Sequence, residues 1–227
     1  MTAPLLLCIE SATKNCSVAL FKGEECITVK EESSESYIHS EKLALFVEEV
    51  LAQADDSRKM LAAVVISAGP GSYTGLRIGT ALAKGICFSL NIPLISVPSL
   101  SQLAHAAHFI DSSFNYYIPM LDARRMEVYC GVFNNELHQE LDTSAKVIDI
   151  NSFSEFSHKR IAIFGDGAEK CLELLEVKVE LIDLECSARN MGKLALQKYS
   201  DKEFESLAYY EPFYLKEFIA GTPKKLL

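Results

Sequence analysis

Three short β-prone runs follow one another at the start of the chain, and they restrict its fold more than any other feature. The runs are Leu5–Glu10, Cys16–Phe21 and Glu25–Glu31. Short polar turns separate them, and this spacing predicts an antiparallel meander. Helices and strands then alternate: a helix over 37–54, a buried strand over 62–67, a helix over 76–90 and a strand over 93–97. The sequence therefore predicts an α/β unit of order β-β-β-α-β-α-β.

The second part of the chain continues with mixed elements. A helix is predicted over 99–108, a hairpin over 116–133, a strand from residue 160 and a helix over 188–199. Because 227 residues with 49% hydrophobic content can bury a substantial core, we expect two half-domains that share a cleft. We place the seam near residues 97–101, with one half-domain over 1–100 and the other over 101–207.

The charge balance excludes nucleic acid as a direct partner of the isolated chain. The formal net charge is -9 and the pI is near 5.1, whereas nucleic-acid affinity depends on lysine and arginine side chains that neutralise phosphates. No run approaches the ~18 apolar residues of a membrane helix, and no export signal is recognised, so we expect a cytoplasmic protein without membrane contact. Seven cysteines without a CxxC pair indicate reduced core thiols.

The glycine-rich stretch SAGPGSYTGLRIG at 67–79 looks like a phosphate loop, but its spacing fits neither common nucleotide motif. It has no Gly-Lys pair for a Walker loop, and Thr74 stands where a dinucleotide fingerprint needs a glycine. Anion binding at the helix N-terminus, with Arg77 one turn in, is an alternative. We interpret the stretch as structural, because Gly75, Gly79 and Ala83 form a small helical face that allows close packing.

The helix after this loop is apolar on nearly every side, so we expect a second molecule to cover part of it. We predict that its small face packs with the helix over 37–54 and with a partner. Whether this face meets the chain's own core or the partner stays open at this point. The predicted interface residues are His39, Leu43, Phe46, Tyr73, Thr74, Gly75, Arg77, Ile78, Gly79, Leu82 and Ala83.

Four motifs give the chain a resemblance to a known family that runs essentially from end to end. The motifs AGPGSYTGLRIG, DARRMEVY, FGDGA and EPFYLKEF together resemble the bacterial TsaB (YeaZ) family. The resemblance implies an actin-like (ASKHA) fold of two RNase H-like halves, with a tail over about 208–227 that packs back on the first half. It also implies a role in forming N6-threonylcarbamoyladenosine in tRNAs that read ANN codons.

The same resemblance implies partners. In that system TsaD is a metalloprotein that transfers the threonylcarbamoyl group, TsaB is its non-catalytic partner, and TsaE is an ATPase that joins the pair. We therefore expect a heterodimer with TsaD, TsaE bound on that pair, a homodimer when the chain is alone, and contact with tRNA only through the complex.

Positions that carry chemistry in TsaD carry other residues in this sequence. By the match, the two metal-binding histidine positions fall on Ser99 and Leu103, and Ser99 with Gln102 predicts instead a capping box that opens a plain helix. The degenerate nucleotide-site positions are Glu10, Asp122, Gly165 and Gly167. We therefore expect no catalytic residue and no metal or other cofactor. The alternative is an actin-fold enzyme, either a residual ATPase, a kinase or an M22-type metallopeptidase.

Overall fold

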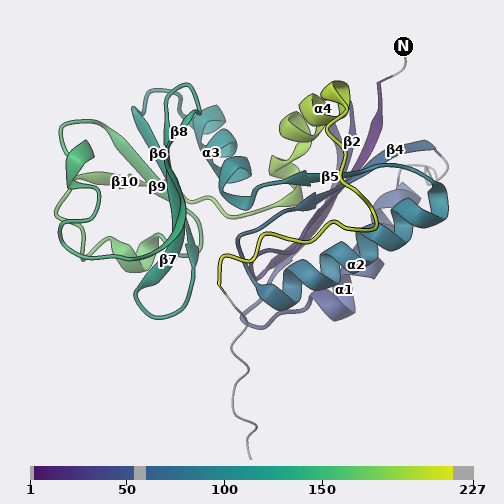
Figure 1. Cartoon of the computed structure of the whole chain (residues 1–227), viewed down its shortest axis with the longest axis horizontal. Helices are drawn as coiled ribbons and strands as arrows, with labels where there is room; N and C mark the ends of the chain where they lie inside the picture. The colour runs from purple at the N-terminus through teal and green to yellow at the C-terminus, as the bar shows by residue number, and fades with distance from the viewer. Residues whose placement is uncertain (1–2, 54–59, 217–227) are drawn as a thin grey trace, which may run out of the picture.

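The structure is a computed structural model that describes residues 3–53 and 60–216, and it contains two five-stranded sheets side by side (Figure 1). The first sheet has the strand order β3-β2-β1-β4-β5. β1, β2 and β3 pair antiparallel, whereas β4 pairs parallel to β1 and β5 parallel to β4. The strands are β1 (Leu5–Glu10), β2 (Asn15–Lys22), β3 (Glu25–Ser33), β4 (Leu61–Ser67) and β5 (Leu94–Val97).

The second sheet repeats this topology with the order β10-β9-β6-β7-β8. β6, β7 and β8 pair antiparallel, and β9 and β10 continue the sheet in parallel on the other side of β6. Each sheet thus places its first strand at the centre, which is the RNase H-like arrangement, and the predicted actin-like fold of two such halves is confirmed. The strands are β6 (Tyr116–Asp122), β7 (Glu127–Asn134), β8 (Gln139–Val147), β9 (Ile161–Phe164) and β10 (Val179–Leu181).

Two of these strands were not predicted from the sequence. β8 is polar and largely exposed along its length, so it lacks the alternation that marks a half-buried strand. β10 has only three residues, which is too short for a periodic signal. Both are edge strands, and their pairing partners rather than their own residues specify them.

α1 (His39–Gln53) and α2 (Tyr73–Leu90) cover one face of the first sheet (Figure 1). Leu7 and Ile9 of β1 point into their core, while Leu6 and Cys8 point to the opposite face. This double burial explains why β1 is an unbroken apolar run. α2 begins at Tyr73 rather than at the predicted residue 76, because the Ser72 side chain accepts a hydrogen bond from the Gly75 amide and caps the helix.

The opposite face of the first sheet is covered by α4 (Gly192–Asp201), which comes from the other end of the chain (Figure 1). Met191 and Ala195 pack there against Leu6 and Cys8. This packing differs from the sequence assignment, which placed residues 101–207 in the second half-domain. The difference has a physical cause, since the second face of a fully buried sheet needs an apolar cover and residues 1–100 supply none.

α3 (Ser99–Ile110) lies on the second sheet, where Leu100, Leu103 and Ala104 pack against Tyr117 and other core residues. No helix among residues 3–53 and 60–216 is long and apolar enough to span a bilayer. Because β5 belongs to the first sheet, α3 packs on the second and α4 packs on the first, the chain crosses between the halves at β5–α3 and returns before α4.

The segment that follows α4 runs across β5 and then along α2 (Figure 1). The Glu205 amide donates to the Leu94 carbonyl at 2.9 Å, and the Phe213 amide donates to the Ala68 carbonyl at 2.7 Å. At its end the Lys216 ammonium contacts the Glu127 carboxylate on β7. This part of the predicted tail thus lies on the first half and reaches the second, whereas residues 217–227 of that prediction lie outside the described residues.

Candidate functional site

The carboxyl group of Glu10 is the central feature of the region between the two sheets. Glu10 ends β1 and is fully buried, with 0% exposure. Its Oε1 accepts a hydrogen bond from the Ala12 amide at 2.6 Å, and its Oε2 accepts one from the Gln102 side chain of α3. Burial raises the pKa of this carboxyl above its ordinary value, although the hydrogen bonds oppose the shift. This pair of side chains joins the end of β1 in the first half to α3 on the second sheet.

The contact between Glu10 and Gln102 corrects the predicted capping box. The N-cap of α3 is Pro98, no side chain caps the helix, and the Ser99 hydroxyl has no hydrogen-bond partner among the described residues. Gln102 instead turns its amide to Glu10, 92 positions away along the chain. A buried amide needs a polar partner, and the sequence around Gln102 does not indicate which residue that partner is. Leu103, at the second expected histidine position, lies in the core of the second half.

The glycine-rich loop rests on the turn that follows β1. A Cβ atom on Gly71 would lie 2.4 Å from the Ala12 carbonyl oxygen, and one on Gly75 would lie 2.1 Å from the Ser11 carbonyl oxygen. The Ser72 amide donates to the Ala12 carbonyl at 2.6 Å. Gly75 and Gly79 therefore lie against the turn at Ser11 of their own chain rather than against another helix, whereas Ala83 packs in the core that α1 also lines. The glycines allow α2 to approach the Ser11–Ala12 backbone closely, in agreement with the structural interpretation of this stretch.

The turn at Gly165–Ala168 packs against the end of β6 in a similar way. Gly165 has φ +100, and a Cβ atom there would lie 2.4 Å from the Met120 carbonyl oxygen, so glycine is required on both counts. The Gly167 amide donates to the same carbonyl at 3.0 Å. Asp166, between them, accepts a hydrogen bond from the Asp122 amide at 3.0 Å. The backbone groups of this turn are thus used within the fold.

The polar side chains near these turns are mainly acidic. Burial raises the pKa of Asp166, and the Asp122 and Glu185 carboxylates add to the shift. Cys186 lies close enough to Glu10 and Asp166 that both carboxylates, after burial itself, raise the pKa of its thiol. The structure therefore gathers Glu10, Asp122 and the Gly165–Gly167 turn around one acidic region. Such a region disfavours a polyphosphate, which needs cations or free amides.

Lys170 is a cation that contacts this region, and its ammonium already has three acceptors within the fold. Its ammonium contacts the Asp122 carboxylate and donates to the Arg125 carbonyl at 2.7 Å and to the Glu127 carbonyl at 2.9 Å. Within the described residues, no three histidine, cysteine or carboxylate side chains gather as metal ligands would. The contacts of Lys170, Gln102, Asp166 and Cys186 were not predicted from the sequence, because each joins segments that are far apart along the chain.

Comparison with known proteins places the chain in a family. Residues 32–183 match the family model described as TsaD, tRNA N6-adenosine threonylcarbamoyltransferase. The chain belongs to the TsaD family and, within it, to the TsaB (YeaZ) group.

Its relatives in the TsaB group include two proteins named tRNA threonylcarbamoyladenosine biosynthesis protein TsaB. The Haemophilus influenzae protein is 32% identical over 55% of this chain and 51% of its own length, so the chain spans about half of that relative. The Escherichia coli protein is 25% identical over 95% of this chain and 96% of its own length. The solved structure of YeaZ from Pseudomonas aeruginosa shares the fold, with a TM-score of 0.82 and 24% identity over 93% of this chain and all of that one.

The interface residues predicted for this member of the TsaB group divide into two sets. The first set is buried within the fold of the isolated chain and exposes almost no surface, so its assignment to an interface stays a prediction. Thr74 and Arg77 are exposed, and Tyr73, Ile78 and Leu82 are partly exposed. The buried set comprises His39, Leu43, Phe46, Gly75, Gly79 and Ala83.

The exposed residues of the first two helices form a surface that shares Thr74 and Arg77 with the predicted interface. Phe88 on α2 is 81% exposed, and Leu45 on α1 is also exposed. Arg77 stands over the ring of Tyr73 at 4.8 Å, and Tyr73 packs against Tyr214 of the C-terminal segment at 4.8 Å. We call the exposed residues Leu45, Thr74, Arg77 and Phe88 the helix surface.

Proposed function

We propose that this chain is a non-catalytic subunit in the formation of N6-threonylcarbamoyladenosine in tRNAs that read ANN codons, where it binds and activates TsaD. One observation carries the non-catalytic part of the proposal: the Glu10 carboxyl is fully buried and accepts hydrogen bonds from the Ala12 amide and from the Gln102 side chain of the second half. A group in that state cannot reach a substrate. The names of the relatives in Haemophilus influenzae and Escherichia coli support the pathway.

The other degenerate positions support the same proposal. Asp122 is held by the Arg124 amide at 3.0 Å and by the Lys170 ammonium. Ser99 and Leu103 are buried where the resemblance places metal ligands in TsaD, and leucine has no donor atom. Activity of the whole complex therefore rests on chemistry supplied by TsaD, while this chain supplies a surface.

We place the TsaD contact on the helix surface. Arg77 and Phe88 are exposed near opposite ends of α2, and arginine and phenylalanine are both enriched at interfaces. In the absence of TsaD we expect the same surface to form a homodimer, and in its presence we expect TsaE to bind the pair. With a net charge of -9, the chain meets tRNA, in the cytoplasm, only through the complex.

A reconstitution tests this function. The purified chain, TsaD, TsaE and the enzyme that forms the threonylcarbamoyl intermediate are mixed with tRNA, and modified nucleoside is measured by mass spectrometry. We expect modification to require the chain, and the chain alone to bind no tRNA at physiological salt. Full modification without the chain, or tight tRNA binding by it alone, would contradict the proposal.

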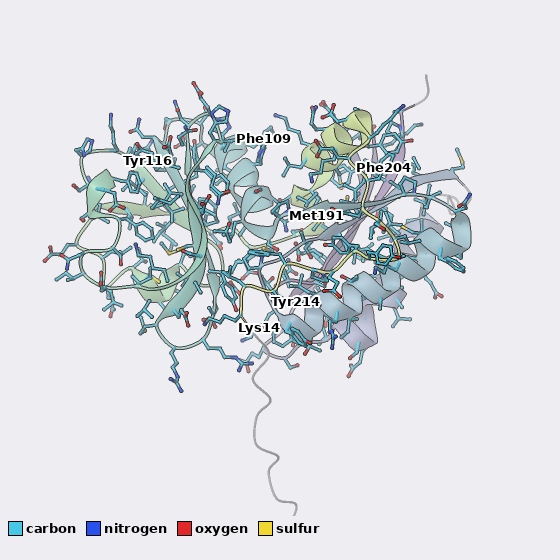
Figure 2. All side chains as sticks on the ribbon, in the orientation of Figure 1. Lys14, Phe109, Tyr116, Met191, Phe204 and Tyr214 are labelled. Atoms are coloured by element: carbon cyan, nitrogen blue, oxygen red, sulfur yellow. The ribbon has the colours of Figure 1, made fainter. Side chains whose placement is uncertain are left out.

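Two matched variants test the location of the contact. Phe88→Asp adds a charge to the helix surface, and we expect it to abolish binding of TsaD in size-exclusion chromatography. Phe109→Asp is the control, since Phe109 is 91% exposed at the far end of α3, away from α1 and α2 (Figure 2). Equal loss of TsaD binding in both variants, or in neither, would show that the contact lies elsewhere.

The alternative function, an actin-fold ATPase or a metallopeptidase, has no observation in its favour. Metal analysis and an ATP hydrolysis assay on the isolated chain distinguish the two functions. About one tightly held transition-metal ion per chain would favour the enzyme.

A further inference from the structure

A shallow groove lies between the C-terminal segment and β5, the edge strand of the first sheet. Its volume is about 650 Å³. Phe204 and Tyr214 mark the two ends of the stretch of chain that borders it (Figure 2). The lining residues within this stretch are Glu205, Tyr209, Tyr210, Glu211, Pro212, Phe213 and Tyr214, and Ala68 and Ser96 lie opposite.

The walls of this groove are held in place by hydrogen bonds on both sides. The backbone of the segment is tied to β5 and to the loop before α2 through the Glu205 and Phe213 amides. The Lys84 ammonium of α2 donates to the Tyr210 carbonyl at 2.7 Å. A ligand of the groove would thus meet a preformed surface, which lowers the entropy lost on binding.

Large aromatic side chains stand exposed along this groove. Tyr209 is 88% exposed and Phe213 is 49% exposed. Tyr210 and Tyr214 also line the groove, where Tyr210 packs against the core of the first half and the Tyr214 ring packs against Tyr73. Exposed aromatic rings in a preformed groove are typical of recognition surfaces.

The charged side chains that line the groove, Glu205 and Glu211, are both acidic. The Glu205 carboxylate accepts a hydrogen bond from the Ser96 hydroxyl at 2.5 Å. In the part of the chain that the structure describes, neither Glu205 nor Glu211 forms an ion pair. Burial raises the pKa of the Tyr210 phenol, and the nearby Glu205 carboxylate adds to the shift. The Tyr210 phenol therefore stays neutral, and the charge of the lining side chains is negative.

We propose that this groove binds an arginine side chain of a partner protein. A guanidinium group stacks on aromatic faces and pairs with carboxylates through a planar fork of donors. Arginine is favoured over lysine because several rings line the groove, and a compact ammonium uses ring faces less well. An anion is disfavoured by both carboxylates. This inference goes beyond the proposed function and is tested without TsaD or tRNA.

The test uses the full chain with labelled tyrosine and a blocked pentapeptide, Gly-Gly-Arg-Gly-Gly, titrated by NMR. Matched peptides carry citrulline, which keeps the shape without the charge, or lysine in place of arginine. We expect the arginine peptide to shift the signals of Tyr209 and Tyr210, the lysine peptide to bind more weakly, and the citrulline peptide to leave them unchanged. Free L-arginine, with its charged backbone groups, should bind no more tightly than the peptide.

Variants of the groove complete the experiment. Tyr209→Ala should weaken binding of the arginine peptide about two- to fivefold, which corresponds to one exposed cation–π contact. Glu211→Gln should also weaken it, whereas Glu24→Gln, in the exposed turn between β2 and β3, should not. Circular dichroism checks that each variant is folded. The proposal is overturned if citrulline or lysine peptides bind as tightly, if free arginine binds more tightly, or if Tyr209→Ala leaves affinity unchanged.

Discussion

Replacing Gly75 by alanine tests the conclusion that the small face of α2 meets its own chain. The new Cβ atom would lie 2.1 Å from the Ser11 carbonyl oxygen, far inside the ~3.5–4.0 Å at which non-bonded carbon atoms pack best. The Ser11 backbone has little freedom to retreat, since the Ala12 amide is bonded to Glu10 at 2.6 Å and the Ala12 carbonyl to the Ser72 amide at 2.6 Å. Overpacking is therefore expected to break native hydrogen bonds.

The expected change in the free energy of unfolding for Gly75→Ala is the sum of two opposing effects. Overpacking a rigid site costs about 1–3 kcal/mol, and the contact with a fixed carbonyl argues for the upper end. Alanine gains up to about 1 kcal/mol over glycine in a helix. The net loss is about 2 kcal/mol, which lowers the melting temperature of a chain of this length by about 4–8 °C.

Gly85→Ala is the matched control on the same helix. A Cβ atom at Gly85 meets no atom within 4 Å, so only the helix preference remains and we expect a gain of about 0.5–1 kcal/mol. Gly79→Ala should fall between the two, because the closest atom to its Cβ is the Ser11 hydroxyl at 2.3 Å, which can rotate, although the Ser11 Cβ at 3.1 Å stays close.

Urea unfolding followed by circular dichroism measures these changes, with the slope of the transition compared between variants so that midpoints can be converted to free energies. The reasoning is refuted if Gly75→Ala is as stable as the unmodified chain or as Gly85→Ala. That result would mean that the small face has free space and is available to another molecule.

Two further predictions concern buried ionisable groups. The raised pKa of Glu10 means that the folded state holds a proton that the unfolded state releases. The free energy of unfolding therefore falls as pH rises from the ordinary glutamate range through the folded pKa, by up to about 1.4 kcal/mol per pH unit. Glu10→Gln should flatten this part of the plot of urea midpoint against pH, and an unchanged slope would disprove the prediction. His39 is buried, neither ring nitrogen has a hydrogen-bond partner among the described residues, and burial lowers its pKa, so stability present above the ordinary histidine value is lost as pH falls through the folded pKa. His39→Leu should remove that acid-dependent loss of stability. A variant that still loses as much stability below about pH 6.5 would contradict the assignment of the loss to His39.

The sequence by itself determined the order of elements in the first half. Leu5–Glu10 and Asn15–Lys22 contain short apolar runs bounded by polar turns, and the two helices repeat apolar residues at helical spacing, so each signal lies in the element's own residues. The missing Gly-Lys pair in the stretch at 67–79 and the spacing of the cysteines can likewise be observed directly in the sequence. The resemblance to the TsaB family rested on short motifs of the same kind, and the family match bears it out.

Tertiary structure alone decided which partner each of these elements meets. The small face of α2 could have packed on a helix or on a strand turn, and the approach of Ser11 settled that choice. The sequence around Gln102 also fitted a helix cap, and only the position of α3 beside Glu10 shows which group Gln102 contacts. α4 carries an apolar stripe that fits either sheet, and only the unfilled face of the first sheet specifies its place. Each of these contacts joins residues far apart along the chain, so no local pattern can encode them.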